Sequence, residues 1–176
     1  MKVVGEAPNG FRREGARGIM DGTRSKDRFI TILVAEDDPD DQFLIQGAFE
    51  SCEITGSMVF VENGEELLDY LFRRERYQDA NAALRPSCLL LDLNMPLMDG
   101  REALWRIRQA SEYRQMPIVV LTTSDSPEDR EYCMDLGVSR FFTKPDTFDE
   151  LLHLMHSIKG ICRYPSDPDP PPAQEA

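Results

Sequence analysis

The chain has 176 residues, of which 41% are hydrophobic, and it carries 20 basic against 32 acidic side chains for a net charge of −12. This length and apolar content fit one globular domain with tails. The negative charge argues against nonspecific binding to nucleic acid or to an anionic membrane, because both need a basic surface. No apolar run approaches the roughly 20 residues of a membrane span, and no secretory signal is present, so we expect a cytoplasmic protein.

The two ends of the chain differ in composition from its middle. Residues 1–28 are rich in Gly and Arg with seven basic side chains, and residues 163–176 are rich in proline. Neither segment has the periodicity of a helix or a strand, so we predict two disordered tails around one domain over residues 29–162.

The four cysteines are scattered and form no Cys-x-x-Cys pair, which gives no sign of a zinc site or a disulfide framework. We expect reduced thiols, with Cys88 buried.

Five short apolar runs alternate with five segments of helical character. Most of the runs are apolar throughout rather than every second residue, which is typical of parallel strands covered on both faces. The alternation predicts an α/β sandwich with its site at the carboxyl ends of the strands. The expected strands are residues 30–35, 57–61, 88–93, 117–121 and 139–143, and the expected helices centre on residues 44–49, 67–71, 103–107, 128–136 and 148–158.

Four of the five strands end in residues that can carry chemistry. Glu36 and Asp37 follow the first strand, Asp92 ends the third, Thr122 follows the fourth and Lys144 the fifth. Since the carboxyl ends of parallel strands share one edge of the sheet, these side chains should converge. The second strand is followed by a Glu-Asn-Gly sequence that indicates a turn and a helix cap.

Carboxylates that converge on one edge repel each other unless a cation neutralises them. Hard oxygen ligands favour Mg²⁺, and Glu36 and Asp37 are the best placed to hold it. The acidic run could instead be a solvated helix N-terminus, where the helix dipole favours negative charge. We assign that second interpretation to Asp38, Asp40 and Asp41.

An aspartate at the end of a buried strand beside a cation can attack phosphorus and form an acyl phosphate, which makes Asp92 the candidate nucleophile. In this interpretation Thr122 donates a hydrogen bond to the phosphoryl group and Lys144 holds one of its oxygens. Taken singly, Thr122 could be a helix cap and Lys144 a surface lysine.

Four stretches in this order resemble the receiver domains of two-component response regulators. They are ILVAEDD at 32–38, LLLDLNMPLMDG at 89–100, IVVLTTS at 118–124 and FFTKP at 141–145. The resemblance implies a flavodoxin-like three-layer sandwich, with a five-stranded parallel sheet in the order 2-1-3-4-5 and five helices.

The resemblance also implies roles for individual residues. Glu36, Asp37 and Asp92 would bind Mg²⁺ together with the backbone carbonyl of Asn94, and Asp92 would accept the phosphoryl group.

The remaining roles implied by the family concern the response to phosphorylation. Thr122 would be the switch hydroxyl and Lys144 the phosphate-sensing lysine, and the bond before Pro145 would be cis. Phe141 stands at the switch-aromatic position, where many members have tyrosine, so a polar contact of that hydroxyl is lost here. Phe141 could also be a simple core residue.

The implied function is a single-domain response regulator. A sensor histidine kinase or a histidine phosphotransfer protein would phosphorylate Asp92, and the signal would pass through the surface of the fourth helix, fifth strand and fifth helix. That surface could also form a homodimer. Because few residues follow the last helix, we expect output by contact with a downstream protein. The long segment 72–87 resembles stand-alone regulators paired with phytochrome-type kinases.

Two alternatives remain open at this stage. Haloacid dehalogenase-like phosphatases also use an aspartate nucleophile with Mg²⁺, but they carry a second acid two positions later, where this chain has Asn94. A degenerate receiver would act as a protein interaction module without phosphorylation, which the intact set of site residues argues against.

Overall fold

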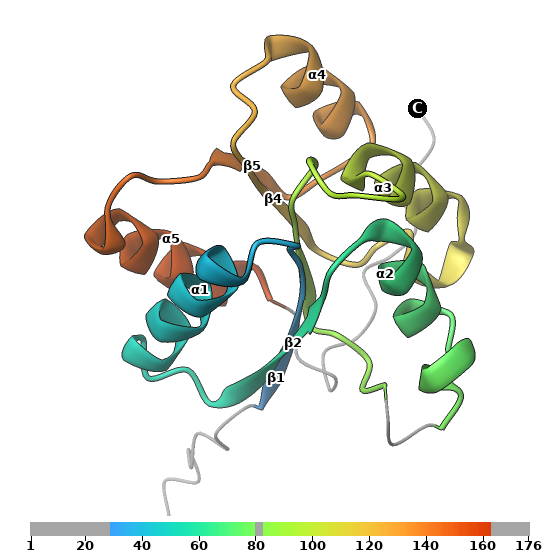
Figure 1. Cartoon of the computed structure of the whole chain (residues 1–176), viewed down its shortest axis with the longest axis horizontal. Coiled ribbons are helices and arrows are strands. Elements are labelled where there is room, and N and C mark those ends of the chain that lie inside the picture. The colour runs from blue at the N-terminus through green and yellow to red at the C-terminus, as the bar shows by residue number, and fades with distance from the viewer. Residues whose placement is uncertain (1–28, 80–82, 163–176) are drawn as a thin grey trace, which may run out of the picture.

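The computed structural model describes residues 29–79 and 83–162, and it places all five strands in one parallel sheet in the order β2-β1-β3-β4-β5 (Figure 1). This is the strand order that the resemblance implied. The predicted tails at 1–28 and 163–176 lie outside the described residues. The strands are β1 (Ile30–Ala35), β2 (Gly56–Val61), β3 (Cys88–Leu91), β4 (Ile118–Thr122) and β5 (Arg140–Thr143).

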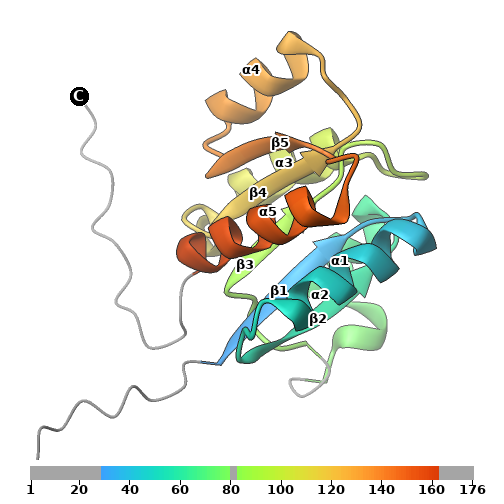
Figure 2. The same ribbon diagram turned by 90° about the vertical axis from the view of Figure 1, so that its left-hand side faces the viewer.

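The five predicted helices are all present and cover both faces of the sheet (Figure 2). α1 packs against α5 on one face, and α2 packs against α3 on the other. None of the helices in the described part of the chain is long and apolar enough to cross a membrane. The helices are α1 (Pro39–Ser51), α2 (Gly64–Leu71), α3 (Gly100–Gln109), α4 (Pro127–Asp135) and α5 (Phe148–Ile161).

The strands are buried because successive side chains enter two separate apolar clusters. In β1, Leu33 joins the cluster beneath α2 and α3, whereas Ile32 and Val34 join the one beneath α1 and α5. Side chains of a strand alternate between faces, so a strand covered on both sides must be apolar at every position. The uninterrupted apolar runs therefore predicted the central strands correctly.

Each helix begins at a side chain that caps it. Asn63 accepts a hydrogen bond from the Glu66 amide at 2.9 Å, so the predicted cap before α2 is confirmed. Asp38 caps α1 by accepting from the Asp40 amide at 2.8 Å, as its assignment to a helix N-terminus implied. These caps fix where each loop after a strand turns into a helix, and the candidate site lies in those loops.

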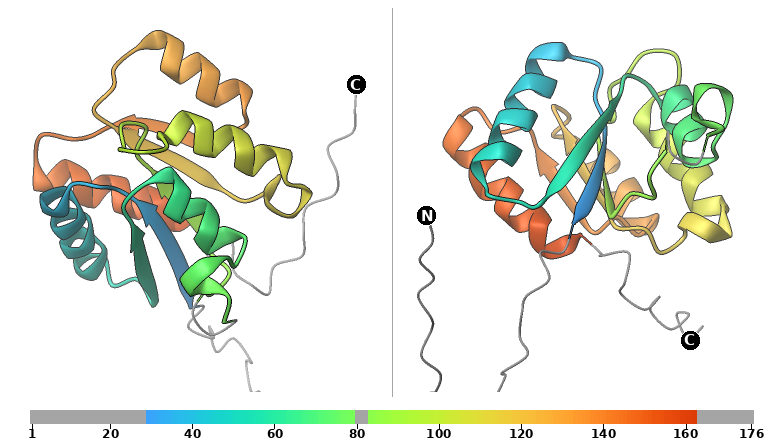
Figure 3. Two further views of the ribbon diagram at one scale, coloured as in Figure 1. Left: turned by 45° about the vertical axis from the view of Figure 1, so that its right-hand side comes forward. Right: turned by 90° about the horizontal axis from the view of Figure 1, so that it is seen from below.

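The described parts of the segment 72–87 pack beside α2, away from the loops that follow β1, β3, β4 and β5 (Figure 3). A short 3₁₀ helix over Glu75–Tyr77 brings the Tyr77 ring to 5.0 Å from that of Tyr70 in an edge-to-face arrangement. The Tyr70 hydroxyl donates to the Leu84 carbonyl at 2.9 Å. These contacts make the described part of this segment an extension of the α2 side of the core.

Candidate functional site

The residues that directly follow β1, β3 and β5 still make backbone hydrogen bonds to the neighbouring strands. These bonds hold the candidate residues at the carboxyl edge of the sheet. The Glu36 amide donates to the Val61 carbonyl at 2.9 Å, and the Asp92 amide donates to the Ala35 carbonyl at 3.0 Å. The Lys144 amide likewise donates to the carbonyl of Thr122, at 2.8 Å. The sheet therefore sets the positions of these residues independently of any ligand.

The acidic residues expected to hold a metal do lie together. Carboxylate oxygens of Glu36, Asp37 and Asp92 are all within 4.8 Å of one another. Glu36 and Asp92 are buried, whereas Asp37 is exposed, so the cluster is open to solvent on one side. Three hard oxygen donors with an open side fit Mg²⁺, which uses few carboxylates and keeps several waters.

Lys144 supplies the positive charge in this cluster. Its Nζ lies 2.7 Å from Glu36 Oε2, 2.9 Å from Asp92 Oδ2 and 2.6 Å from Asp41 Oδ2. Burial disfavours the charged ammonium, but the contacts with Asp41, Asp92 and Glu36 outweigh burial, so the pKa of Lys144 is raised above its ordinary value. Lys144 is thus a cation bound among carboxylates rather than a surface lysine.

The carboxyl group of Glu36 has a perturbed pKa. Burial raises its pKa to about 7, although the hydrogen bond and charge of Lys144 act in the opposite direction. The Asp38 amide donates to Glu36 Oε1 at 3.1 Å, and the side-chain amide of Gln42 donates to the Glu36 carbonyl at 2.7 Å. Glu36 is therefore held in place by the start of α1.

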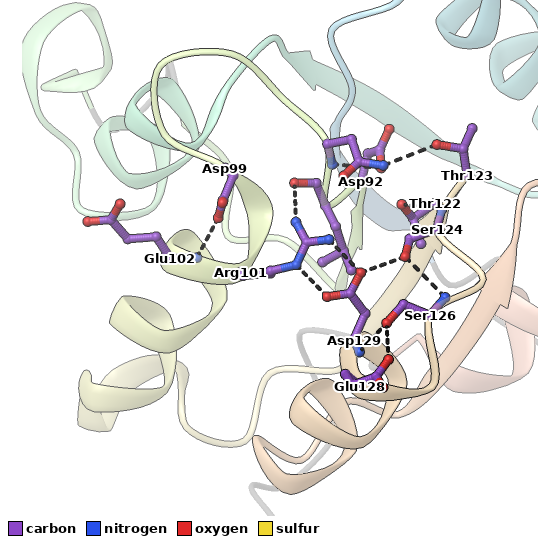
Figure 4. Close-up of polar contacts among 12 residues, drawn as sticks. Asp92, Asp99, Arg101, Glu102, Thr122, Thr123, Ser124, Ser126, Glu128 and Asp129 are labelled. Atoms are coloured by element: carbon purple, nitrogen blue, oxygen red, sulfur yellow. Dashed lines mark hydrogen bonds and ion pairs between the residues drawn. The ribbon is translucent and has the colours of Figure 1, made fainter.

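Asp92 and the first residues after β4 lie near each other at this edge of the sheet (Figure 4). The Asn94 amide donates to Asp92 Oδ1 at 3.1 Å, and its side chain donates to the Thr123 hydroxyl at 3.1 Å. The Thr122 side chain is fully buried and accepts from the Ser124 amide at 3.3 Å. Thr122 is thus the last residue of β4 rather than the cap of α4, which is Ser126.

Phe141 points into the core, in the cluster beneath α2 and α3. The Arg130 guanidinium lies 4.6 Å from the centre of its ring, and an Arg130 nitrogen donates to the Phe141 carbonyl at 3.3 Å. The aromatic side chain is thus buried in this structure and is covered from α4 by a cation.

The expectation of a cis bond before Pro145 is wrong, because the described residues contain no cis peptide bond. The trans form of an X-Pro bond is favoured by roughly 0.5–1 kcal/mol when nothing else decides. Here the trans chain already brings Lys144 Nζ to the carboxylates.

One residue of the site was misjudged from the sequence. Asp41 was assigned to a solvated helix N-terminus, but it shares Lys144 with Glu36 and Asp92. Its position in the first turn of α1 was visible in the sequence. The direction in which that turn faces was not, because it depends on how α1 packs.

A second group of polar contacts near the site was not predicted at all. Arg101 on α3 makes two hydrogen bonds to Asp129 on α4, with Nε at 2.6 Å from Oδ1 and a terminal nitrogen at 2.5 Å from Oδ2 (Figure 4). The Ser124 hydroxyl donates to Asp129 at 2.5 Å, and Arg101 also reaches the Leu93 carbonyl at 3.4 Å. This Arg101–Asp129 pair joins the loops after β3 and β4.

We expect Asp129→Asn to lower the free energy of unfolding by about 1 kcal/mol at pH 7. The hydrogen bonds from Arg101 lower the pKa of Asp129 to about 2. Because that pKa is depressed in the folded state, the stabilisation is complete above the ordinary aspartate pKa of about 4 and is lost as pH falls through about 2. In urea unfolding, the difference in unfolding free energy between wild type and Asp129→Asn should therefore be constant from pH 7 to 5 and should shrink below pH 4.

Asp125→Asn is the control for that measurement, because Asp125 is an exposed carboxylate on the same loop. A difference between wild type and Asp129→Asn that stayed the same down to pH 3 would contradict an ionic role of the pair.

Comparison with known proteins identifies the fold family. The family model of the response regulator receiver domain matches residues 32–156. The chain belongs to this family. A receiver domain is a module of two-component signalling, and the phosphatase alternative is not supported, since the residue two positions after Asp92 is Asn94.

Two curated relatives match most of the receiver domain and most of their own length. The probable methanogenesis regulatory protein FilR2 of Methanothrix harundinacea is 35% identical over 139 residues, which cover 79% of this chain and 86% of FilR2. The response regulator Rcp1 of Synechocystis is 31% identical and covers 74% of this chain and 86% of Rcp1.

Solved structures give the same result. The phosphorylated cyanobacterial phytochrome response regulator RcpA is 34% identical, with a TM-score of 0.68 over 74% of this chain and 91% of RcpA. The Mn²⁺-bound form of Rcp1 is 30% identical, with a TM-score of 0.68 over 74% of this chain and 92% of that chain. Similar solved structures thus include one phosphorylated and one metal-bound regulator.

Proposed function

We propose that this protein is a response regulator that accepts a phosphoryl group on Asp92 from a histidine kinase or a histidine phosphotransfer protein. The observation that carries the proposal is the position of the Asp92 carboxylate. It follows a central strand, lies in the cluster with Glu36 and Asp37, and has Lys144 Nζ at 2.9 Å. The proposed role is signalling rather than substrate turnover.

In the proposed reaction an Asp92 oxygen attacks the phosphorus of a phosphohistidine. The new bond joins carboxylate oxygen to phosphorus, the phosphorus–nitrogen bond breaks, and the released imidazole takes up a proton. Lys144 is within reach of Asp92 and holds a phosphoryl oxygen as a point charge. Thr122, the last residue of β4, turns its hydroxyl to another oxygen.

Mg²⁺ is the cation that this proposal requires, because the donors are three carboxylates on an open edge. Glu36, Asp37 and Asp92 would hold it, with the backbone carbonyl of Asn94 as a further ligand. When bound, it neutralises charge on the phosphoryl oxygens. The Mn²⁺-bound structure of Rcp1 supports a divalent cation at this kind of site.

The test is intact-mass spectrometry of the full chain after incubation with acetyl phosphate and Mg²⁺. Wild type should gain one phosphate, and Asp92→Asn should gain none, because an amide cannot form the acyl phosphate. Asp146→Asn is the matched control, since Asp146 is an exposed carboxylate two residues after Lys144, and it should be labelled like wild type.

Absence of an adduct on folded wild type, or an adduct that survives in Asp92→Asn, would contradict the proposal. The first result would favour the degenerate receiver, which acts as an interaction module without phosphorylation. Unchanged partner binding by Asp92→Ala would support that same alternative.

The kinase partner in this proposal is of the phytochrome type, and the names of RcpA and of other similar regulators support it. Phosphotransfer from a panel of histidine kinases should then be fastest from phytochrome-type members. Equal or faster transfer from unrelated kinases would contradict the pairing.

The proposed output is a change in the surface of α4, β5 and α5, because the family resemblance gives the switch roles to Thr122 on β4 and Phe141 on β5. A homodimer through this surface stays a prediction. Sedimentation with and without acetyl phosphate tests it, and a monomer in both conditions would rule it out.

A further inference from the structure

Two thiols from distant parts of the chain meet at the end of the sheet opposite to Asp92. Cys88 is the first residue of β3, and Cys162 follows the last turn of α5, where its amide donates to the Ile158 carbonyl. Their sulfur atoms are 2.7 Å apart although the residues are separated by 74 positions. A disulfide has an S–S bond of about 2.05 Å, so the two sulfurs need to approach by less than an ångström.

Within the described part of the chain, neither thiol of this Cys88–Cys162 pair has another polar partner. Both belong to the apolar cluster beneath α1 and α5, together with Leu90 and Ile158. Cys52 lies in the same cluster but contacts the Leu152 carbonyl at 3.7 Å rather than another thiol. The pair is therefore the one place in the described chain where two sulfurs are in contact.

We propose that Cys88 and Cys162 are a redox site, which forms an intramolecular disulfide when the protein meets a peroxide. The sulfur of one thiol attacks a peroxide oxygen and becomes a sulfenic acid as the O–O bond breaks and water leaves. The second sulfur then attacks the first, and the sulfenic oxygen departs with the thiol proton as a second water. Two thiols are thereby oxidised, and one hydrogen peroxide is reduced to two waters.

Exposure decides which thiol reacts first. Cys162 is 7% exposed at the edge of α5, whereas Cys88 is 0% exposed and inaccessible to an oxidant. Contact with Cys162 and burial raise the pKa of Cys88 well above its usual range, so Cys88 stays protonated. Cys162 therefore attacks the peroxide, and Cys88 resolves the sulfenic acid.

The bond would tie the end of α5 to the start of β3. In the reduced protein that helix end is held by apolar packing and by its cap, whereas a disulfide closes a loop of 74 positions in the unfolded chain. Asp92 follows the other end of β3. In a reducing cytoplasm such a bond is transient, which is typical of a sensing rather than a structural disulfide.

The experiment treats the reduced full chain with hydrogen peroxide and measures its intact mass. Wild type should lose about 2 Da, for two hydrogens, and recover them with a thiol reductant. Peptide mapping without reductant should show Cys88 joined to Cys162. The melting temperature of the oxidised protein should rise by about 10 °C.

Cys162→Ala is the principal variant, because it alters the edge of the core, and Cys52→Ala is the matched control in the same cluster. The Cys162→Ala protein should not form the linked peptide, whereas Cys52→Ala should form it as wild type does. Retention of all thiols by wild type, linkage of a different pair, or oxidation that stops at sulfinic acid on Cys162 would overturn the proposal. Mapping of wild type decides it even if a variant folds poorly.

Discussion

Gly100→Ala is expected to lower the free energy of unfolding by about 3 kcal/mol and to slow phosphate labelling of Asp92 at least tenfold. Gly100 begins α3, and its amide donates to the Leu93 carbonyl at 3.0 Å. A Cβ atom there would lie 2.1 Å from the Asp92 carbonyl oxygen and 2.8 Å from Leu93 Cα. Both are backbone atoms, which cannot avoid the new methyl group by a change of rotamer. Either α3 or the backbone of Asp92 must therefore shift.

Gly160→Ala is the matched control, because the same methyl group has nothing within 4 Å at that position of α5. Replacing glycine inside a helix should raise stability by about 0.5–1 kcal/mol. Urea unfolding of the two variants should therefore give changes of opposite sign. If Gly100→Ala were as stable as wild type, α3 would not be packed against the backbone of Asp92 and Leu93 as closely as the structure indicates.

Local patterns were enough to predict the elements of this fold. A run such as Ile30–Ala35 is apolar at every position except Thr31 because both faces of β1 are covered, and this pattern can be recognised in the sequence alone. The α4 segment has the weakest helical periodicity of the five helices, and its burial in the structure explains this. Only Cys133 of α4 is buried, so the helix has almost no apolar stripe. The order of the strands came from the family resemblance.

Most of the site could be predicted from the residues that follow the strands, because the carboxyl ends of parallel strands lie at one edge of the sheet. Asp92 and Lys144 come together for that reason alone. Contacts made by helix side chains could not be predicted in this way, because they depend on how each helix is rotated about its axis and packed against its neighbours. Asp41 and the Arg101–Asp129 pair are of this kind.

The Pro145 bond illustrates a third situation. The two isomers of an X-Pro bond differ in free energy by roughly 0.5–1 kcal/mol, so neither the local sequence nor the geometry usual in the family decides which isomer forms. The surrounding structure does, and here it gives the trans form.

Lys144→Met is expected to lower the free energy of unfolding by about 3 kcal/mol when Mg²⁺ is removed by a chelator. Lys144 Nζ is the cation nearest Glu36 and Asp92, which are only 2% and 4% exposed. Methionine keeps the length of the side chain but removes the ammonium that pairs with both carboxylates. Lys159→Met is the control, since Lys159 is exposed on α5 and should change stability little.

The loss of stability in Lys144→Met should depend on pH, and the pKa of Glu36 sets the direction of this dependence. Burial raises its folded pKa to about 7, and removing Lys144 raises it further, so a proton on Glu36 relieves part of the repulsion at low pH. A carboxyl group with a raised folded pKa destabilises the fold as pH rises from its unfolded pKa towards the folded one. The difference between Lys144→Met and wild type should therefore be larger at pH 8 than at pH 6.

Mg²⁺ should stabilise both proteins, because the carboxylates form a site only in the folded chain, but it should stabilise Lys144→Met more. The ammonium of Lys144 contacts two of the carboxylates that Mg²⁺ would use, and like charges repel. Titration of the melting temperature should give the variant a dissociation constant for Mg²⁺ about tenfold lower than that of wild type. Weaker Mg²⁺ binding in the variant would mean that Lys144 organises the carboxylates for the metal instead of competing with it. If millimolar Mg²⁺ changed the melting temperature of neither protein, the proposal of a metal site would be wrong.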